Sequence, residues 1–299
     1  METHNGTELN EFILMGITNH PGLQAPLFGL FLIIYMISVV GNLGMIILTK
    51  MDSKLQTPMY FFLRHLAFTD LGYSTTVGPK MFVNFVEDQN VISYYSCAIQ
   101  LAFFLVFIVS EIFILSAMSY DRYVAICNPL LYPVIMSQRV CWVLVAIPYV
   151  YSTFVSLLVT IKLFNLSFCG YRVISHFYCD SLPLLSLLCS NTHEVEMIIL
   201  ILAGFDLIFS LLVVLVSYLL ILASTLRMSS AEGSHKAFTT CGSHLTVVIS
   251  SHSFDTDKLA SIFYTLVIPM LNPLIYSLRN KDVKCALHRM WKKSCNLFY

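Results

Sequence analysis

The amino-acid sequence predicts an all-α membrane protein, and three observations support this fold class. The 299 residues are 57% hydrophobic and only 11% charged, whereas soluble domains carry about 25% charged residues. Apolar stretches recur that are too long for core helices and approach the ~20 residues needed to cross a bilayer. Continuous apolar runs such as 207–216 do not alternate in polarity, as the strands of a membrane barrel would. A helical bundle satisfies the backbone hydrogen bonds in lipid.

Hydropathy divides the chain into seven expected spans, and no Gly/Ser-rich linker separates them. The spans are expected at residues 27–48, 59–82, 97–120, 140–163, 195–222, 236–253 and 259–278. We therefore expect a single domain over residues 1–299. It comprises an N-terminal segment (1–26), a seven-transmembrane helix bundle (27–278) and a C-terminal tail (279–299).

The sixth expected span is unusually short. Its densely apolar part is only 245–249, and Ser250-Ser251-His252-Ser253 follows at once. A helix over 236–253 would be ~27 Å long, which barely crosses a ~30 Å hydrocarbon core. Because mismatch costs only fractions of a kcal/mol per Å, we expect a shortened sixth helix whose insertion is difficult but not forbidden.

Charge sets the expected orientation. Residues 1–26 contain three glutamates and no Lys or Arg, whereas residues 279–299 contain six basic side chains. By the positive-inside rule, the N-terminus lies outside the cell and the tail lies in the cytosol. The multi-pass chain is then expected at the plasma membrane, with its first span acting as an uncleaved anchor.

The tail is expected to form an amphipathic helix on the inner leaflet. Apolar residues recur in it at helical spacing among Lys and Arg: Val283, Ala286, Leu287, Met290 and Trp291. Cys295 is either a palmitoylation site or a free thiol.

Four of the nine cysteines lie on the expected outer side, namely Cys97, Cys169, Cys179 and Cys189. An oxidising compartment favours two disulfides among them, and the sequence alone allows three pairings. His176 and Cys179 also resemble a metal-ligand pair, but a bridged sulfur is a poor ligand, so we expect no metal.

Asn5-Gly6-Thr7 is a glycosylation sequon in the exposed N-terminal segment, and we expect Asn5 to be modified. Asn165-Leu166-Ser167 also matches the sequon but lies close to the membrane. Asn165 is therefore either glycosylated or an unmodified match to the pattern.

Five motifs occur in order along the chain: LQTPMYFFLRHLAFTD at 55–70, MSYDRYVAIC at 118–127, SY at 217–218, KAFTTCGSHL at 236–245 and PMLNPLIYSLRN at 269–280. With them the chain resembles a mammalian olfactory receptor, within the rhodopsin-like G-protein-coupled receptors. The resemblance covers nearly the whole chain and implies the pairs Cys97–Cys179 and Cys169–Cys189.

The resemblance also implies roles for polar residues. Arg122 would be the centre of G-protein coupling, flanked by Asp121 and Tyr123 and contacted in the active state by Tyr218, His244 and Tyr276. Ionisable residues inside a membrane are expensive and usually functional. The resemblance places Asp70 and Glu111 around an internal cation and water site. The alternative is that one protonated carboxyl group simply braces the bundle.

Similar receptors hold odorants between the outer halves of spans three, five, six and seven. The candidate ligand-binding residues are Leu101, Phe104, Leu105, Ile108, Leu202, Asp206, Ile262 and Thr265. The residues of the third span share one helix face, and a mostly apolar pocket suits a small volatile molecule. Ordinary helix packing would give the same stripe, and Asp206 could equally be a neutral contact within the bundle.

The sequence therefore indicates an odorant receptor that binds small hydrophobic molecules and activates a heterotrimeric G protein of the olfactory, cAMP-raising type. The alternative is a truncated, folding-impaired membrane protein that is retained in the endoplasmic reticulum and does not signal. For the odorant receptor, the expected partners are an odorant, the G protein and membrane lipid. We expect no nucleic acid, no cofactor and no enzymatic activity, because no catalytic constellation is present.

Overall fold

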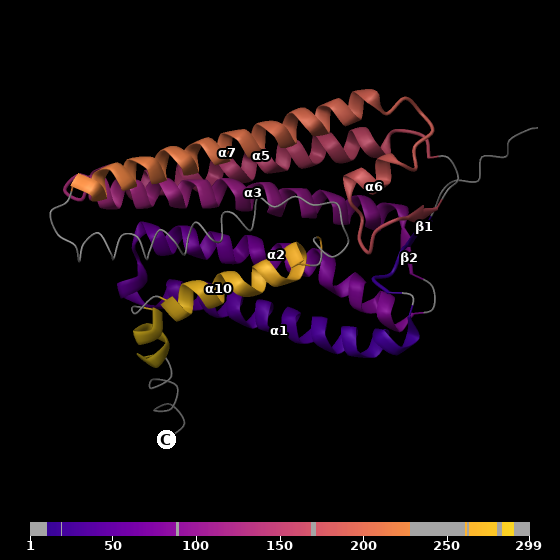
Figure 1. Cartoon of the computed structure of the whole chain (residues 1–299), viewed down its shortest axis with the longest axis horizontal. Helices are drawn as coiled ribbons and strands as arrows, with labels where there is room; N and C mark the ends of the chain where they lie inside the picture. The colour runs from indigo at the N-terminus through magenta and orange to yellow at the C-terminus, as the bar shows by residue number, and fades with distance from the viewer. Residues whose placement is uncertain are drawn as a thin grey trace, which may run out of the picture.

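The computed structural model of the chain describes residues 11–18, 20–87, 90–168, 172–227, 261, 263–279 and 283–289. This part of the chain is built mainly from long helices (Figure 1). They are α1 (Pro21–Met51), α2 (Pro58–Val86), α3 (Tyr94–Cys127), α5 (Gln138–Phe164), α7 (His193–Arg227) and α10 (Ile268–Arg279), which continues a π-helical turn, η2 (Phe263–Val267). Each matches an expected span, and the expected sixth span lies outside the described residues.

Within the described residues, four helices are long and apolar enough to cross a membrane: Gly22–Met51, Tyr94–Cys127, Gln138–Phe164 and His193–Leu226. Helix α2 has 29 residues, enough to span a bilayer, but it is less apolar because it carries Arg64, His65, Asp70 and Lys80. The helices start earlier or end later than hydropathy indicates; α1, for example, begins at Pro21 rather than at residue 27.

Helix α3 lies at the centre of the bundle. It packs against α2, α5 and α7, while α1 packs against α2 and α10, and the helices run roughly along one common axis (Figure 1). In the most apolar window of α3, 67% of residues are buried, against 17% in α7. A helix that is apolar all round is expected to be buried. Because α3 is central and long, its residues can connect the two ends of the bundle.

A small sheet closes one end of the bundle, and the sequence analysis did not predict it. Strand β1 (Glu11–Leu14) pairs antiparallel with β2 (Val91–Ser93) and parallel with β3 (Val173–Ile174). The side chains of Phe12 and Leu14 are 0% and 1% exposed, so they anchor the N-terminal segment. We call this end the strand end, and the end at which helix 283–289 lies the tail end (Figure 1).

Three short helices complete the described fold: η1 (Ser53–Leu55), α4 (Tyr132–Ile135) and α6 (Ser181–Leu185). The first two follow α1 and α3 at the tail end, and α6 lies at the strand end (Figure 1). In helix 283–289, Val283 and Ala286 are buried while Leu287 is 48% exposed. This agrees with the amphipathic helix expected in the tail.

Candidate functional site

The last turns of α3 hold the Asp121-Arg122-Tyr123 motif at the tail end. The Asp121 carboxylate is 2% exposed and accepts a hydrogen bond of 2.9 Å from the hydroxyl of Tyr132 in α4. The Arg122 guanidinium reaches the sulfur of Met59 at the start of α2. Tyr132 was not predicted as a site residue, and no motif around it indicated that its hydroxyl would reach Asp121.

The other residues expected to contact Arg122 are only partly described. Tyr218 of α7 is half-buried and packs against the apolar cluster that includes Leu115 and Met118 of α3. Tyr276 lies within α10, and its side chain is not described. His244 lies outside the described residues. Tyr218 therefore comes from a helix that packs directly on α3, the helix that carries Arg122.

A buried polar network joins spans that are far apart in the sequence. The Asn272 side-chain amide of α10 donates to both oxygens of Asp70 in α2, at 3.1 and 3.0 Å. Asp70 is 0% exposed and Glu111 of α3 is 2% exposed, and the two carboxyl groups lie close enough to interact. The structure therefore brings the predicted pair Asp70 and Glu111 together. Their role in cation binding stays a prediction.

Asn42 ties the first span to the bundle. Its amide donates to the carbonyl oxygen of Pro269 in α10 at 2.9 Å and to that of Ser38 at 3.0 Å. The Ser38 hydroxyl in turn bonds that of Ser74 in α2 at 3.2 Å. Helices α1, α2 and α10 are thus joined by buried polar contacts, which stabilise helix association in a membrane.

Two of the candidate ligand-binding residues face the loop that follows α5. Phe104 and Ile108 of α3 belong to an apolar cluster that also holds Phe177, Tyr178 and Leu266. The ring of Phe104 lies 5.0 Å from that of Tyr178. Aromatic rings at such spacing attract one another beyond simple burial. The side chains after Ile174 therefore cover this part of α3, which the sequence analysis did not foresee.

The remaining candidate ligand residues are spread over different surroundings. Leu101 packs in a second cluster, under β1 and beside Cys97, and Leu105 touches both clusters. Asp206 of α7 accepts a 2.7 Å hydrogen bond from the Tyr151 hydroxyl of α5. Leu202 is partly buried on α7, and Thr265 is 0% exposed. Ile262 lies outside the described residues.

The loop after α5 is fastened at several points. Cys97 and Cys179 form the expected disulfide, and the backbone N–H of Cys179 donates to Gln100 of α3 at 3.0 Å. The His176 ring contacts the Ser261 hydroxyl at 3.0 Å. Cys189 is also disulfide-bonded; its expected partner Cys169 lies outside the described residues, as does Asn5. Within the described part of the chain, no cluster of His, Cys, Asp or Glu could hold a metal ion.

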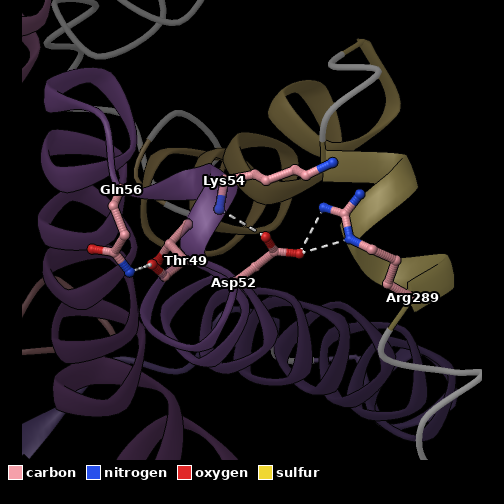
Figure 2. Close-up of polar contacts among 5 residues, drawn as sticks. All are labelled: Thr49, Asp52, Lys54, Gln56 and Arg289. Atoms are coloured by element: carbon pink, nitrogen blue, oxygen red, sulfur yellow. Dashed lines mark hydrogen bonds and ion pairs between the residues drawn. The ribbon is translucent and has the colours of Figure 1, made fainter.

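At the tail end, the loop after α1 binds helix 283–289. The guanidinium of Arg289 donates to one oxygen of Asp52 from Nε at 3.0 Å and from Nη2 at 2.7 Å (Figure 2). The other Asp52 oxygen accepts the backbone N–H of Lys54 at 3.0 Å. These hydrogen bonds, that from Arg289 foremost, hold the pKa of Asp52 below its usual 3.8. The contact joins residues 237 positions apart.

The same loop caps the end of α1. Gln56 donates its amide to the carbonyl oxygens of Thr49 and Lys50 at 3.1 and 3.2 Å, and Arg64 of α2 donates to the Thr49 carbonyl at 2.6 Å. The last carbonyl groups of a helix lack partners within the helix, so these side chains satisfy them. Figure 2 shows the Gln56 amide directed at Thr49, which lies near the end of α1, with Asp52 close by.

Comparison with known proteins agrees with this geometry. The family model described as "Olfactory receptor" matches residues 31–294. This chain belongs to the olfactory receptor family. It is similar to human Olfactory receptor 8K3, with 76% identity covering 100% of both chains, and to human Olfactory receptor 8K1, with 66% identity over 95% of this chain and 93% of that one. Mouse Olfactory receptor 8U3 is 56% identical over 94% of this chain and 93% of its own length.

Membership in this family identifies the fold and the general activity. The fold is a seven-transmembrane helix bundle, and the protein is an odorant receptor of the G-protein-coupled class and not an enzyme. The alignment with Olfactory receptor 8K3 extends over 312 positions, whereas this chain has 299 residues. About 13 positions of the alignment (312 minus 299) therefore have no counterpart in this chain.

Proposed function

We propose that this receptor binds small hydrophobic, volatile molecules and activates a heterotrimeric G protein that raises cAMP. It acts at the plasma membrane, with the strand end outside and the tail end in the cytosol. The observation that carries the proposal is the position of Arg122, at the tail end of the central helix α3. Its neighbour Asp121 is hydrogen-bonded to Tyr132, so this carboxylate has a partner other than Arg122. An exchange of ion-pair and hydrogen-bond partners between two conformations is a common way to link ligand binding to a change at a distant site.

Ligand binding is proposed at the opposite end of the same helix. Phe104 and Ile108 line α3 beneath Tyr178, and Thr265 lies in the π-helical turn that precedes α10. An apolar surface with few polar groups suits a small volatile molecule. Helix α3 connects this region to Arg122, which supports a direct mechanical link between the two.

The experiment combines surface staining with a cAMP reporter in cells exposed to a panel of volatile compounds. We expect staining of an N-terminal tag in intact cells and a cAMP rise with at least one compound. Arg122→Ala should abolish the cAMP rise while leaving the surface signal unchanged. A response that survives Arg122→Ala would contradict the assigned role of this residue, and staining of a C-terminal tag in intact cells would contradict the orientation.

A second candidate function follows from the length of the chain. The chain is about 13 positions shorter than its alignment with Olfactory receptor 8K3, and we assign this difference to the shortened sixth span expected at residues 236–253. The alternative is a receptor that inserts poorly and stays in the endoplasmic reticulum. A chain in which the sixth span is lengthened with apolar residues after Ile249 should then gain surface expression. Equal surface expression of the two chains would remove this alternative.

A further inference from the structure

A small cavity at the strand end has no candidate ligand residue of α3 or α7 in its described wall, although Met81 and Phe177 of that wall belong to the same apolar cluster as Phe104 and Ile108. Its volume is about 250 Å³, slightly below the usual range for ligand pockets of roughly 300–1,000 Å³, so it suits a small molecule. The N-terminal segment, the start of α1, the end of α2 and the loop after α5 all contribute to its wall. The lining residues are Gly16, Ile17, Thr18, Gln24, Met81, Asn84, Phe85, Asn90 and Phe177.

Two side-chain amides in this wall have unmet hydrogen-bonding capacity. Both polar atoms of Asn84, Oδ1 and Nδ2, are shielded from solvent and have no hydrogen-bond partner among the described residues, and the same holds for Oδ1 of Asn90. Buried polar atoms in proteins nearly always have a partner, and an exception calls for a specific explanation. Here the two residues line the same cavity, so one bound molecule can satisfy both.

The surrounding fold holds the backbone at these two residues. The backbone carbonyl of Asn90 accepts a 2.8 Å hydrogen bond from Leu14 of β1, and Asn84 lies in the last turn of α2. A Cβ atom at Gly16 would lie 3.4 Å from the amide nitrogen of Asn90, so the backbone approaches that side chain closely. A preorganised site of this kind binds without a large ordering cost.

The lining residues define the chemistry of the ligand. Asn84 Oδ1 and Asn90 Oδ1 accept hydrogen bonds and Asn84 Nδ2 donates them, so a ligand that satisfies all three atoms offers two donors and an acceptor. Among the described residues, no charged side chain lines the cavity, while Met81, Phe85 and Phe177 supply an apolar wall. Isolated charges bind poorly in such surroundings. We propose that this cavity is a second binding site, which takes a small neutral molecule with a primary amide or hydroxyl group on a short apolar body.

The inference goes beyond the proposed odorant site, and the chemistry predicts an order of affinity. A primary amide satisfies all three unmet atoms, whereas an alcohol satisfies two. A methyl ester has an acceptor but no donor, and a carboxylate adds a charge that nothing in the wall compensates. Hexanamide should therefore bind more tightly than hexan-1-ol, hexan-1-ol more tightly than methyl pentanoate, and hexanoate least.

The test measures protection of a cysteine placed in the cavity wall. The full chain carrying Thr18→Cys is purified in lipid nanodiscs and treated with a small methanethiosulfonate reagent, and modification of residue 18 is followed by mass spectrometry. Tyr95→Cys is the matched control, because residue 95 starts α3 near the same end, is 78% exposed and does not line the cavity. If Thr18→Cys does not fold, Gln24→Cys in the same wall replaces it.

We expect hexanamide at ten times its Kd to slow modification at residue 18 about ten-fold, as simple occupancy dictates, and to leave residue 95 unaffected. Asn84→Leu, which removes both unmet atoms of that side chain, should weaken this protection about ten-fold or more in Kd, because a site built for polar groups then loses its partners. Equal protection at both cysteines, protection that survives Asn84→Leu, protection by hexanoate, or no protection at all would each overturn the proposal. The last outcome would mean that the cavity holds water only. Since no G protein takes part, failure of signalling leaves this result unaffected.

Discussion

The contact between Asp52 and Arg289 gives the most quantitative prediction. Two of the three guanidinium nitrogens, Nε and Nη2, donate to one carboxylate oxygen, at 3.0 and 2.7 Å (Figure 2). The Asp52 side chain is 11% exposed and that of Arg289 is 41% exposed, so solvent screens the pair in part. Exposed ion pairs contribute about 0.2–1 kcal/mol to stability. Because two guanidinium nitrogens donate to the carboxylate, we expect the upper half of that range. We therefore assign this pair about 0.5–1 kcal/mol.

That free energy should appear as local opening of helix 283–289. Asp52→Asn should raise the hydrogen-exchange rate of its amides by about two- to five-fold, because exchange reports the equilibrium between docked and open helix. Arg289→Gln should have a similar effect. The double variant should exchange no faster than either single variant, since the two side chains act only through one another.

The measurement is hydrogen exchange with mass spectrometry on the purified receptor. Lys284→Gln is the matched control, because Lys284 is an exposed basic residue of the same helix and its loss should leave exchange unchanged. Reversing both charges, Asp52→Arg with Arg289→Asp, should restore part of the protection. If Asp52→Asn leaves the helix fully protected, or if the two single effects add in the double variant, the ion pair does not hold the helix.

The pH dependence of this protection follows from the lowered pKa of Asp52, which the hydrogen bond from Arg289 causes. A carboxylate whose pKa is lower in the docked state stabilises that state fully above its ordinary value of 3.8 and progressively less as pH falls through the lowered pKa. After correction for intrinsic exchange, protection due to the pair should be constant between about pH 8 and pH 5 and should decline only below the ordinary pKa. A decline centred near neutral pH would implicate another group.

Three further predictions concern the bundle, each measured by thermal unfolding of the purified receptor. Gly72→Ala should destabilise the bundle by about 1–3 kcal/mol, because an added Cβ would lie 2.4 to 2.7 Å from ring atoms of Phe107. Adding Phe107→Leu should relieve the clash. An unchanged melting temperature in Gly72→Ala would contradict this packing. Tyr151→Phe should cost about 1–3 kcal/mol by leaving the Asp206 carboxyl without its partner. Adding Asp206→Leu should recover part of that loss, and no recovery would argue against the pair. Replacing both Cys97 and Cys179 with Ser should cost about 2–5 kcal/mol, because the disulfide closes a separation of 82 residues; an unchanged melting temperature would show that the loop is held by other contacts.

The sequence predicted the long helices well because lipid imposes a simple requirement. A segment that crosses a bilayer must be apolar over ~20 residues and satisfy its own backbone, and this requirement can be read from composition alone. The ends of the helices were less predictable. Helix α7 runs from His193 to Arg227, beyond the apolar stretch 195–222, because a helix can continue into water once the polar residues at its ends are solvated.

The side-chain pairs could not be predicted in the same way. Asp70 and Asn272 lie 202 residues apart, and no periodicity in the sequence relates their positions. The pairing depends on how α2 and α10 pack, which hydropathy does not determine. The sheet at the strand end was missed for a related reason. Its strands have two to four residues, too few for an alternating pattern to be recognised, and they pair only because three distant segments meet there.

The contacts between the described helices bear on the predicted shortening of the sixth span. Helix α10 is held by Asn42 through Pro269 and by Asp70 through Asn272, and α3 packs against α2, α5 and α7. None of these contacts requires residues 236–253, so the rest of the bundle has an independent basis for assembly. Shortening of the sixth span should therefore affect signalling more than folding. The inner residues of that span, including His244, are retained in the sequence, whereas its outer part, which is expected to contribute to ligand binding, is shortened. We therefore expect a receptor that reaches the cell surface but responds weakly to every odorant, rather than one that is completely retained in the endoplasmic reticulum.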